Sequence, residues 1–396
     1  MKQSNSFSMQ VLPPSELMPV VAQVINKPQM DALNWQVEPV SGSGGGGASG
    51  MVGLYRLRGS AQVGRQKYPW SVVVKVFNSG GISGIGADTF NNPSAWNYWK
   101  RELLAYSSGL LNELDGNLAA PRCYRVTEHS QDEWWLWLED ITETPPTWSL
   151  EQYGLAARHL GQFNGSYLTR RALPAEQPWF YRGRAREWLK TAEAMFAGLQ
   201  QHAASPLGQR WLSPKSVARM EKLLLNCQDL LSVLDKLPVC LCHHDTFRRN
   251  LLARDQAGGG TQTVAIDWSM LGYGAVGQEI GITTGTTLFW MEAPGDQAMT
   301  MDQAIFESYV AGLRDMGWSG DSRLARFGYT TTASLVTGLC WATFMGAGAL
   351  SNEAGIKGIE QTLGFKLDDI LAQWAVVHPL SLDLGDEALQ LMDELN

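Results

Sequence analysis

The pattern of hydrophobic residues changes once along this chain of 396 residues. Up to about residue 141, short segments rich in β-branched and aromatic residues predominate, at 35–40, 51–61, 71–77, 119–129 and 133–141. Such segments, separated by glycine-containing turns, are typical of β-strands. From residue 149 onward, apolar residues recur every three or four positions and predict helices over 149–168, 183–203 and 213–237. We therefore expect an α+β fold whose first part is mostly sheet and whose second part is mostly helical.

One helix is expected among the strands of the first part. Apolar residues recur at helical steps over 94–114, and Ser94 can cap the first turn. Residues 64–70 have the composition of a turn between two strands. The run of glycine and serine at 41–50 could be a flexible linker, but strands flank it closely on both sides. We interpret it as a loop that joins two paired strands over a ligand.

Composition excludes several classes of protein. The net charge of −8 disfavours general nucleic-acid binding, which needs a basic surface. Five cysteines without a CxxC pair, and an N-terminus without an apolar signal segment, favour the reducing cytoplasm. Residues 327–352 carry no charge, but serine, threonine and glycine interrupt the apolar residues throughout. We interpret this segment as a helix buried in a core rather than a membrane span.

The residues with chemical potential are concentrated between 239 and 282. A short apolar strand, 239–242, leads into the polar segment HHDTFRRN at 243–250. A hairpin of 250–255 and 262–268 follows. One interpretation is a zinc site built from Cys240, Cys242 and a histidine, but a strand would place His243 and His244 on opposite faces. The cysteines are better explained as packing residues of a buried strand.

Phosphoryl transfer makes demands that this segment meets. It needs a carboxylate at the attacking hydroxyl and oxygen ligands for Mg²⁺. Asp245 is followed five residues later by Asn250, and Asp267 ends the second hairpin strand. A loop, a hairpin and an aspartate in this order would bring all three side chains to one cleft.

The order of these residues resembles the signature of the aminoglycoside phosphotransferase and choline kinase superfamily, whose members are protein-kinase-like enzymes acting on small molecules. The pattern runs roughly H-G-D-x-x-x-x-N, then I-D-W, then a glycine and an acidic residue. The matching residues are His243, Asp245, Asn250, Ile266, Asp267, Trp268, Gly274 and Glu279. The chain departs from the pattern at His244, which replaces a glycine, at Ser269, where an acidic residue often stands, and at Glu279, which replaces aspartate.

The resemblance implies a bilobal protein-kinase-like fold. The N-lobe, 1–140, would hold a five-stranded antiparallel sheet with one helix, and the helical C-lobe would occupy 141–396, with a hinge near 139–143. The catalytic loop would be 243–250. The resemblance assigns nucleotide binding to Lys75, Glu102, Gly42, Gly44, Gly47, Glu139 and Ile141, with backbone groups near Asp140 also at the adenine. Taken singly, Lys75, Glu102 and Asp267 could be ordinary strand, helix and turn residues, but their joint order favours a kinase.

The resemblance also implies the reaction. Asp245 would orient the acceptor hydroxyl and take its proton, Asn250 and Asp267 would hold Mg²⁺, and His243 would brace the loop. ATP or GTP would donate its γ-phosphate to a hydroxyl of a small molecule: an aminoglycoside-like antibiotic, an amino alcohol or a sugar. The acidic composition leans toward a cationic acceptor. The alternative is a non-catalytic nucleotide-binding module of the same fold.

No nucleic-acid or membrane partner is expected, and the oligomeric state stays open. Arg248, Arg249, Glu292 and Asp296 are expected to be solvated, with a phosphate contact as the alternative for one arginine.

Overall fold

The computed structural model describes residues 12–40, 50–80, 89–143, 147–256 and 258–395. The chain divides into two compact units. Unit 1 comprises Met1–Asn112 and Ala120–Thr142, and unit 2 comprises Glu113–Ala119 and Glu143–Asn396. The predicted assignment of 1–140 and 141–396 to a nucleotide-binding lobe and a catalytic lobe stays a prediction.

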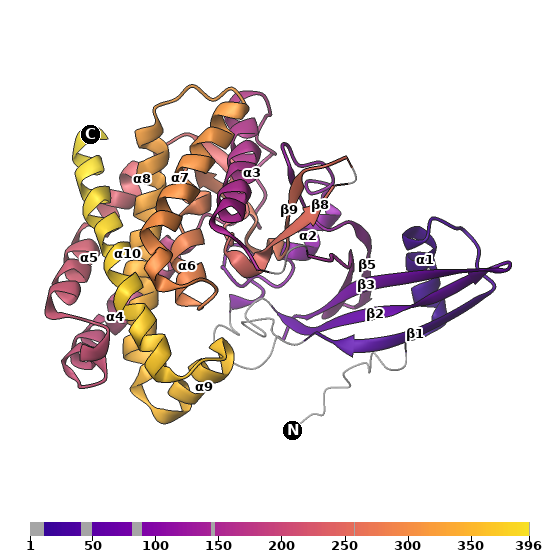
Figure 1. Ribbon diagram of the computed structural model, residues 1–396, viewed down its shortest axis with the longest axis horizontal. Coiled ribbons are helices and arrows are strands. Elements are labelled where there is room, and N and C mark those ends of the chain that lie inside the picture. The colour runs from indigo at the N-terminus through magenta and orange to yellow at the C-terminus, as the bar shows by residue number, and fades with distance from the viewer. Residues whose placement is uncertain (1–11, 41–49, 81–88, 144–146, 257, 396) are drawn as a thin grey trace. The chain divides into compact units, whose positions relative to one another are not determined.

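Unit 1 is built on a five-stranded antiparallel sheet in the order β1-β2-β3-β6-β5 (Figure 1). Its strands are β1 (Ala32–Pro39), β2 (Met51–Val63), β3 (Gln66–Asn78), β5 (Cys123–Ser130) and β6 (Glu133–Glu139). Helix α1 (Pro14–Val24) packs Leu17, Val20 and Val21 into the same hydrophobic core as Val72 and Trp137 of the sheet. Along β3, the alternate residues Trp70, Val72 and Val74 are buried, which gives the sheet a buried face.

The turn between β2 and β3 is shorter than the predicted 64–70. Val63 pairs with Gln66, so the turn itself holds only Gly64 and Arg65. Gly64 has φ +58°, a conformation that glycine adopts without steric cost and that two-residue hairpins require. The residues from Gln66 to Trp70 belong to β3 instead.

The predicted helix over 94–114 is wrong at both ends. Helix α2 covers only Arg101–Ser107, and Ser94 bonds to the Asn92 side chain instead of capping it. The buried Arg101 guanidinium donates to the backbone carbonyls of residues 93, 95 and 96. These carbonyls are thereby satisfied outside a helix, which the apolar spacing could not reveal. Gly109, with φ +79°, follows the end of the helix.

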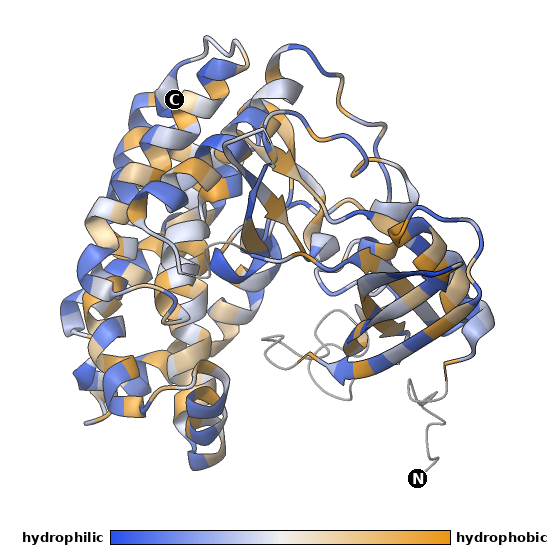
Figure 2. Ribbon diagram, turned by 45° about the vertical axis from the view of Figure 1, so that its right-hand side comes forward, coloured by the Kyte–Doolittle hydropathy of each residue, from blue (hydrophilic) through white to orange (hydrophobic). Residues whose placement is uncertain are grey.

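Unit 2 is mostly helical. Its helices are α3 (Leu150–Thr169), α4 (Arg184–Ala204), α5 (Pro214–Leu234), α6 (Thr283–Phe289), α7 (Ala298–Asp315), α8 (Ser322–Ala333), α9 (Glu353–Leu363) and α10 (Leu367–Leu395). Figure 2 shows hydrophilic and hydrophobic residues side by side along these helices, as expected for amphipathic helices around a core. A β-carbon on Gly161 of α3 would lie 2.2 Å from Tyr309 O of α7, and one on Gly312 would lie 2.0 Å from Arg158 O. The two glycines thus let the backbones of α3 and α7 approach closely.

Two small sheets carry the segment from 239 to 282. Strand β7 (Val239–Cys242) pairs with β10 (Gly272–Ala275). Strand β8 (Leu251–Asp255) pairs with β9 (Thr261–Ala265), which also pairs in parallel with β4 (Leu118–Ala119). The predicted strand at 239–242 and the predicted hairpin are therefore present.

The uncharged segment at 327–352 is helical. Helix α8 continues into π-helical segments, Ser334–Trp341 and Phe344–Gly348, and then a 3₁₀ turn, Ala349–Ser351. The stretch Ser322–Ser351 is long and apolar enough to span a bilayer, but core helices of globular proteins share these properties. Of its most apolar window, 67% is buried within the structure. This burial agrees with the interpretation as a core helix.

Candidate active site

The loop after β7 is held by one buried carboxylate. Glu279, fully buried, accepts a hydrogen bond from the His243 amide at its Oε2 (2.8 Å) and from the His244 amide at its Oε1 (3.0 Å). Asn164 of α3 donates to the same carboxylate at 3.3 Å. Burial raises the pKa of Glu279, while the nearby His243 imidazole and the amide hydrogen bonds oppose the rise. Glu279 thus fixes the backbone immediately before Asp245.

The imidazoles of His243 and His244 both contact backbone carbonyl groups. His243 Nδ1 accepts from the Asp245 amide (3.1 Å), so Nε2 carries the proton and donates to Ile266 O (2.8 Å). His244 has φ +64° and directs Nε2 to Tyr273 O at 2.9 Å. The left-handed conformation explains why a glycine is the usual residue here. His244 therefore ties the loop to β10.

Asp245 is held by side chains on both of its carboxylate oxygens. Asn250 Nδ2 donates to Oδ2 at 3.0 Å, and Arg184 Nη2, from the first residue of α4, lies 2.5 Å from Oδ1. The Asp245 side chain is only 11% exposed. Because Asn250 uses its amide nitrogen on Asp245, its amide oxygen is the atom left for a cation.

Asn250 and Asp267 lie at the same end of the β8–β9 hairpin. Leu251 pairs with Ala265, and the Ile266 amide donates to Asn250 O at 2.9 Å. Asp267 follows directly with φ +61°, an uncommon conformation for a residue other than glycine. The two side chains offer an amide oxygen and a carboxylate, which suit Mg²⁺ once nucleotide phosphates and water complete the coordination. The donor set fits a magnesium ion on its chemistry.

Lys75 and Glu102 form a pair within unit 1. Lys75 Nζ on β3 donates to Glu102 Oε1 and Oε2 of α2 at 2.7 and 2.9 Å. Both residues are buried, at 7% and 1% exposure. Such a buried, bidentate pair holds the lysine in one direction.

The other predicted nucleotide-binding residues lie at the end of β6 or outside the described residues. The Glu139 amide donates to Arg122 O at 2.9 Å. The Asp140 carboxylate accepts from Arg56 Nε at 2.9 Å and from the Ser71 hydroxyl, and Ile141 follows half-buried. Gly42, Gly44 and Gly47 fall in the segment 41–49 and lie outside the described residues. The structure thus gathers Lys75 with Glu102 in unit 1, and Asp245 with Asn250 and the adjacent Asp267 in unit 2.

The loop arginines and Glu292 differ from the sequence-based expectation. Arg248 is buried, pairs with Glu143 at 3.0 Å and stacks on Trp148 at 4.5 Å. Arg249 pairs with Glu292 and lies over the Trp290 ring at 4.7 Å. Their prediction as solvated charges is wrong, because partners distant in sequence bury Arg248 and leave Arg249 and Glu292 only partly exposed. Asp296 is largely exposed, as expected.

Sequence reasoning missed Arg184 altogether. No motif surrounds this arginine, and only its spacing of four from Trp188 on a predicted helix hinted at a shared face. The structure places the guanidinium carbon 5.3 Å from the centre of the Trp188 ring and pairs the side chain with Asp245.

Cys240 and Cys242 are fully buried, with their sulfur atoms 3.6 Å apart. Burial raises the pKa of Cys242 well above its usual value, which keeps it a neutral thiol and a poor metal ligand. Within the described part of the chain, no group of three histidine, cysteine, aspartate or glutamate residues is placed to hold a metal. The packing role expected for these cysteines fits this environment.

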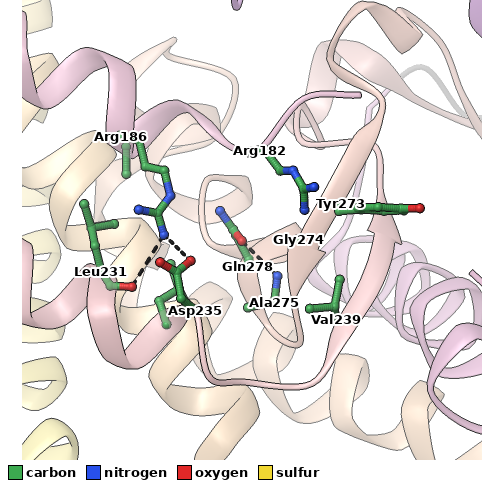
Figure 3. Close-up of a pocket in the computed structure, with 11 residues that line it drawn as sticks. Arg182, Arg186, Leu231, Asp235, Val239, Tyr273, Gly274, Ala275 and Gln278 are labelled. Carbon is green, nitrogen blue, oxygen red and sulfur yellow. Dashed lines mark hydrogen bonds and ion pairs between the residues drawn. The ribbon is translucent and has the colours of Figure 1, made fainter. Parts of the chain in front are cut away.

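A cavity of about 340 Å³ in unit 2 is lined by residues of α4, α5, β7 and β10 and of the segments next to them (Figure 3). Its lining includes Arg182, Arg186, Asp235, Tyr273 and Gln278. Arg186 pairs with Asp235, and Gln278 Oε1 accepts from the Ala275 amide at 2.9 Å. The charged groups on this wall therefore largely satisfy one another.

Comparison with solved structures identifies the class of fold. Choline kinase from Cryptosporidium parvum Iowa II is 11% identical with a TM-score of 0.51, over 97% of this chain and 99% of that chain. This likeness confirms the predicted α+β, bilobal protein-kinase-like fold. A microcompartment-associated aminopropanol kinase is 15% identical with a TM-score of 0.48, over 95% and 99% of the two chains. A macrolide 2′-phosphotransferase from Brachybacterium faecium is 15% identical with a TM-score of 0.45, over 88% and 97%.

The family is identified from the sequence. The profile of the phosphotransferase enzyme family matches residues 94–318, more than half of the chain. The chain belongs to this family, which confirms the resemblance drawn from the motifs. It is a phosphotransferase, an enzyme of the kinase class with an alcohol group as acceptor. A search of curated proteins gave no match.

Proposed function

We propose that this phosphotransferase moves the γ-phosphate of ATP, or GTP, to a hydroxyl group of a small molecule, with Mg²⁺ as cofactor. The observation that carries the proposal is the fixed position of Asp245 between Asn250, His243 and the Glu279-braced backbone. A carboxylate that must orient a hydroxyl needs this immobility, because positioning supplies most of the catalysis in phosphoryl transfer.

The proposed reaction is an in-line displacement. The acceptor oxygen forms a bond to the γ-phosphorus while the bond from that phosphorus to the β-phosphate oxygen breaks, which releases the nucleoside diphosphate. Asp245 orients the hydroxyl and receives its proton late in the step. Asn250 and Asp267 hold Mg²⁺, which offsets the negative charge of the phosphates when it is bound.

We assign Lys75 to the α- and β-phosphates of the nucleotide, with Glu102 holding its direction. The buried ion pair supports this assignment, because the Glu102 carboxylate holds the Lys75 ammonium group in one direction. Backbone groups near Glu139 and Ile141 are assigned to the adenine, and Gly42, Gly44 and Gly47 to the phosphate loop, as the resemblance implies.

The test is nucleotide consumption by the purified chain across amino sugars, amino alcohols, sugars and hydroxy acids, run beside Asp245→Asn. We expect nucleotide and Mg²⁺ binding to survive the change while turnover drops about 10²–10⁴-fold, the usual range for loss of a catalytic base. Asp255→Asn, at the exposed tip of the hairpin, is the matched control and should leave turnover unchanged. Binding of ATP without consumption for any acceptor would instead favour the non-catalytic module, and unchanged turnover in Asp245→Asn would remove that residue from its role.

A further inference from the structure

The Arg184 guanidinium has one buried donor, Nε, that no described residue accepts. Its side chain is nine-tenths buried, at 10% exposure. Nη2 is 2.5 Å from Asp245 Oδ1, whereas Nε is buried and has no hydrogen-bond partner among the residues that the structure describes. Buried polar groups are nearly always satisfied, so an unused guanidinium donor beside a reactive carboxylate points to a ligand atom.

The geometry of the arginine side chain indicates that the ligand is an anion. Nε and one terminal nitrogen of a guanidinium form a flat fork that matches the two oxygens of a carboxylate or phosphate. Asp245 takes only one prong of this fork.

The surroundings of Arg184 add an apolar component. Arg184 stacks on Trp188, whose ring lies 6.1 Å from Trp341 and 5.7 Å from Phe344 in edge-to-face contact. Trp290 continues this series at 6.0 Å from Trp341. We call Trp188, Trp290, Trp341 and Phe344 the aromatic wall; all four are only partly buried.

An apolar cavity adjoins the aromatic wall and could hold an apolar group. Trp290 and Trp341 also line a cavity of about 270 Å³, whose other walls include Met345, Ile359 and Leu363. Apart from the indole nitrogens and one threonine, the lining side chains are apolar. Partly exposed rings beside an apolar cavity gain free energy when an apolar ligand covers them.

We propose that Arg184 binds a carboxylate of the acceptor and that the aromatic wall takes its apolar portion, so that the acceptor is an apolar hydroxy acid. The inference rests on the proposed function, because it takes Asp245 as the residue that receives the acceptor hydroxyl. The carboxylate and the hydroxyl of the acceptor then lie close together, since Arg184 and Asp245 are in direct contact. Arg184 acts as a specificity-determining residue in this arrangement.

The test uses 3-phenyllactate and its amide, which differ in charge but hardly in shape. Binding of each probe to the full chain is titrated through tryptophan fluorescence, with Trp188 as the reporter under Arg184. We expect the acid to bind at least about tenfold more tightly than the amide, because a charge-assisted hydrogen bond to a buried arginine is lost in the amide. Arg184→Gln should bring the ratio of the two affinities close to one.

The matched control is Arg186→Gln, on the same helix but paired with Asp235 and 39% exposed, which should keep the preference for the acid. No binding of the acid, equal binding of acid and amide to the unchanged chain, or a preference that survives Arg184→Gln would each overturn the inference. ATP consumption by the same samples separates the two proposals. A chain that neither binds nor consumes ATP contradicts the proposed function, whereas ATP consumption without preference for the acid contradicts only the role of Arg184.

Discussion

Lys75 Nζ donates to both carboxylate oxygens of Glu102, at 2.7 and 2.9 Å, from strand β3 to helix α2. The two side chains are 9% and 1% exposed, so water contributes little to stabilising either charge. A buried ion pair of this kind is costly to break because the remaining charge is left without compensation. The pair therefore links the position of α2 to the direction of Lys75.

Glu102→Gln is expected to lower both stability and turnover. It leaves the buried Lys75 ammonium without its counter-charge, which costs about 3–5 kcal/mol of unfolding free energy. Thermal unfolding of the purified variant measures the loss. The matched control is Glu38→Gln, which breaks the exposed Arg58–Glu38 pair of the same sheet and should cost about 0–1 kcal/mol. Equal losses in the two variants would contradict the buried role of Lys75 and Glu102.

Asp267→Ala is expected to remove Mg²⁺-dependent activity. Loss of the proposed carboxylate ligand would forfeit several kcal/mol of charge stabilisation, so turnover should fall at least about a hundredfold. Turnover measured against Mg²⁺ concentration checks this, and a chelator should abolish turnover of the unchanged chain. Asp255→Ala, in the same hairpin, serves as the control and should preserve the Mg²⁺ response. A chelator-resistant turnover would refute the metal assignment.

Stability is expected to fall as the pH falls from about 6.5 to about 4 because of two buried histidines. Burial lowers the pKa of His378 to about 4, and burial with the neighbouring Arg158 charge lowers the pKa of His159 to about 4. Between these values and the unfolded pKa near 6.5, the unfolded chain binds more protons, so acid favours unfolding. Protonation of each histidine should lower the free energy of unfolding by roughly 3 kcal/mol as the pH falls through this window.

His378→Gln isolates one of these contributions. His378 Nε2 contacts Gly338 O at 2.9 Å, and the variant removes the titrating group. The difference in unfolding free energy between the unchanged chain and the variant should shrink steadily from pH 6.5 to 4, whatever the carboxylates contribute to both. A difference that stays constant with pH would show that His378 does not titrate in this window.

Gly161→Ala is expected to destabilise unit 2. A β-carbon there would lie 2.2 Å from Tyr309 O, so α3 and α7 must separate, and overpacking of this kind costs about 1–3 kcal/mol. Gly358→Ala in α9 meets no atom within 4 Å and should stabilise by about 0.5–1 kcal/mol through helix propensity. Denaturant unfolding of both variants tests the contrast, and effects of the same sign would contradict the close packing of α3 on α7.

The fold and the loop were largely predictable because their signals are local. Alternation along β3 and the spacing of Asp245, Asn250 and Asp267 are readable within short windows. The helix at 94–114 was not, because the side chain of Arg101 takes up carbonyls that a helix would otherwise use. The pattern at these positions is helical, and a tertiary contact overrides it.

The partners of the catalytic loop were predictable only in part. Glu279 followed from its position in a known pattern, whereas Arg184 belongs to no motif and reaches Asp245 from 61 residues earlier in the chain. The sequence alone predicts a solvated Arg248, because its partners Glu143 and Trp148 are remote in sequence. Two charged residues that are far apart in the sequence produce no periodic pattern. Their pairing can therefore be predicted from one sequence only where a known family pattern includes both.

The π-helical segment Ser334–Trp341 determines the direction in which the following side chains point around the helix axis. A residue in such a wide turn advances the chain around the axis by less than the roughly 100° of an α-helix. Insertion or loss of one residue before Trp341 would swing its indole away from Trp188, while the hydrophobic composition of the helix would hardly change. Relatives of this chain that differ in length by one residue here would therefore present a differently shaped surface beside Asp245, and acceptor preference could diverge without any substitution at the catalytic loop.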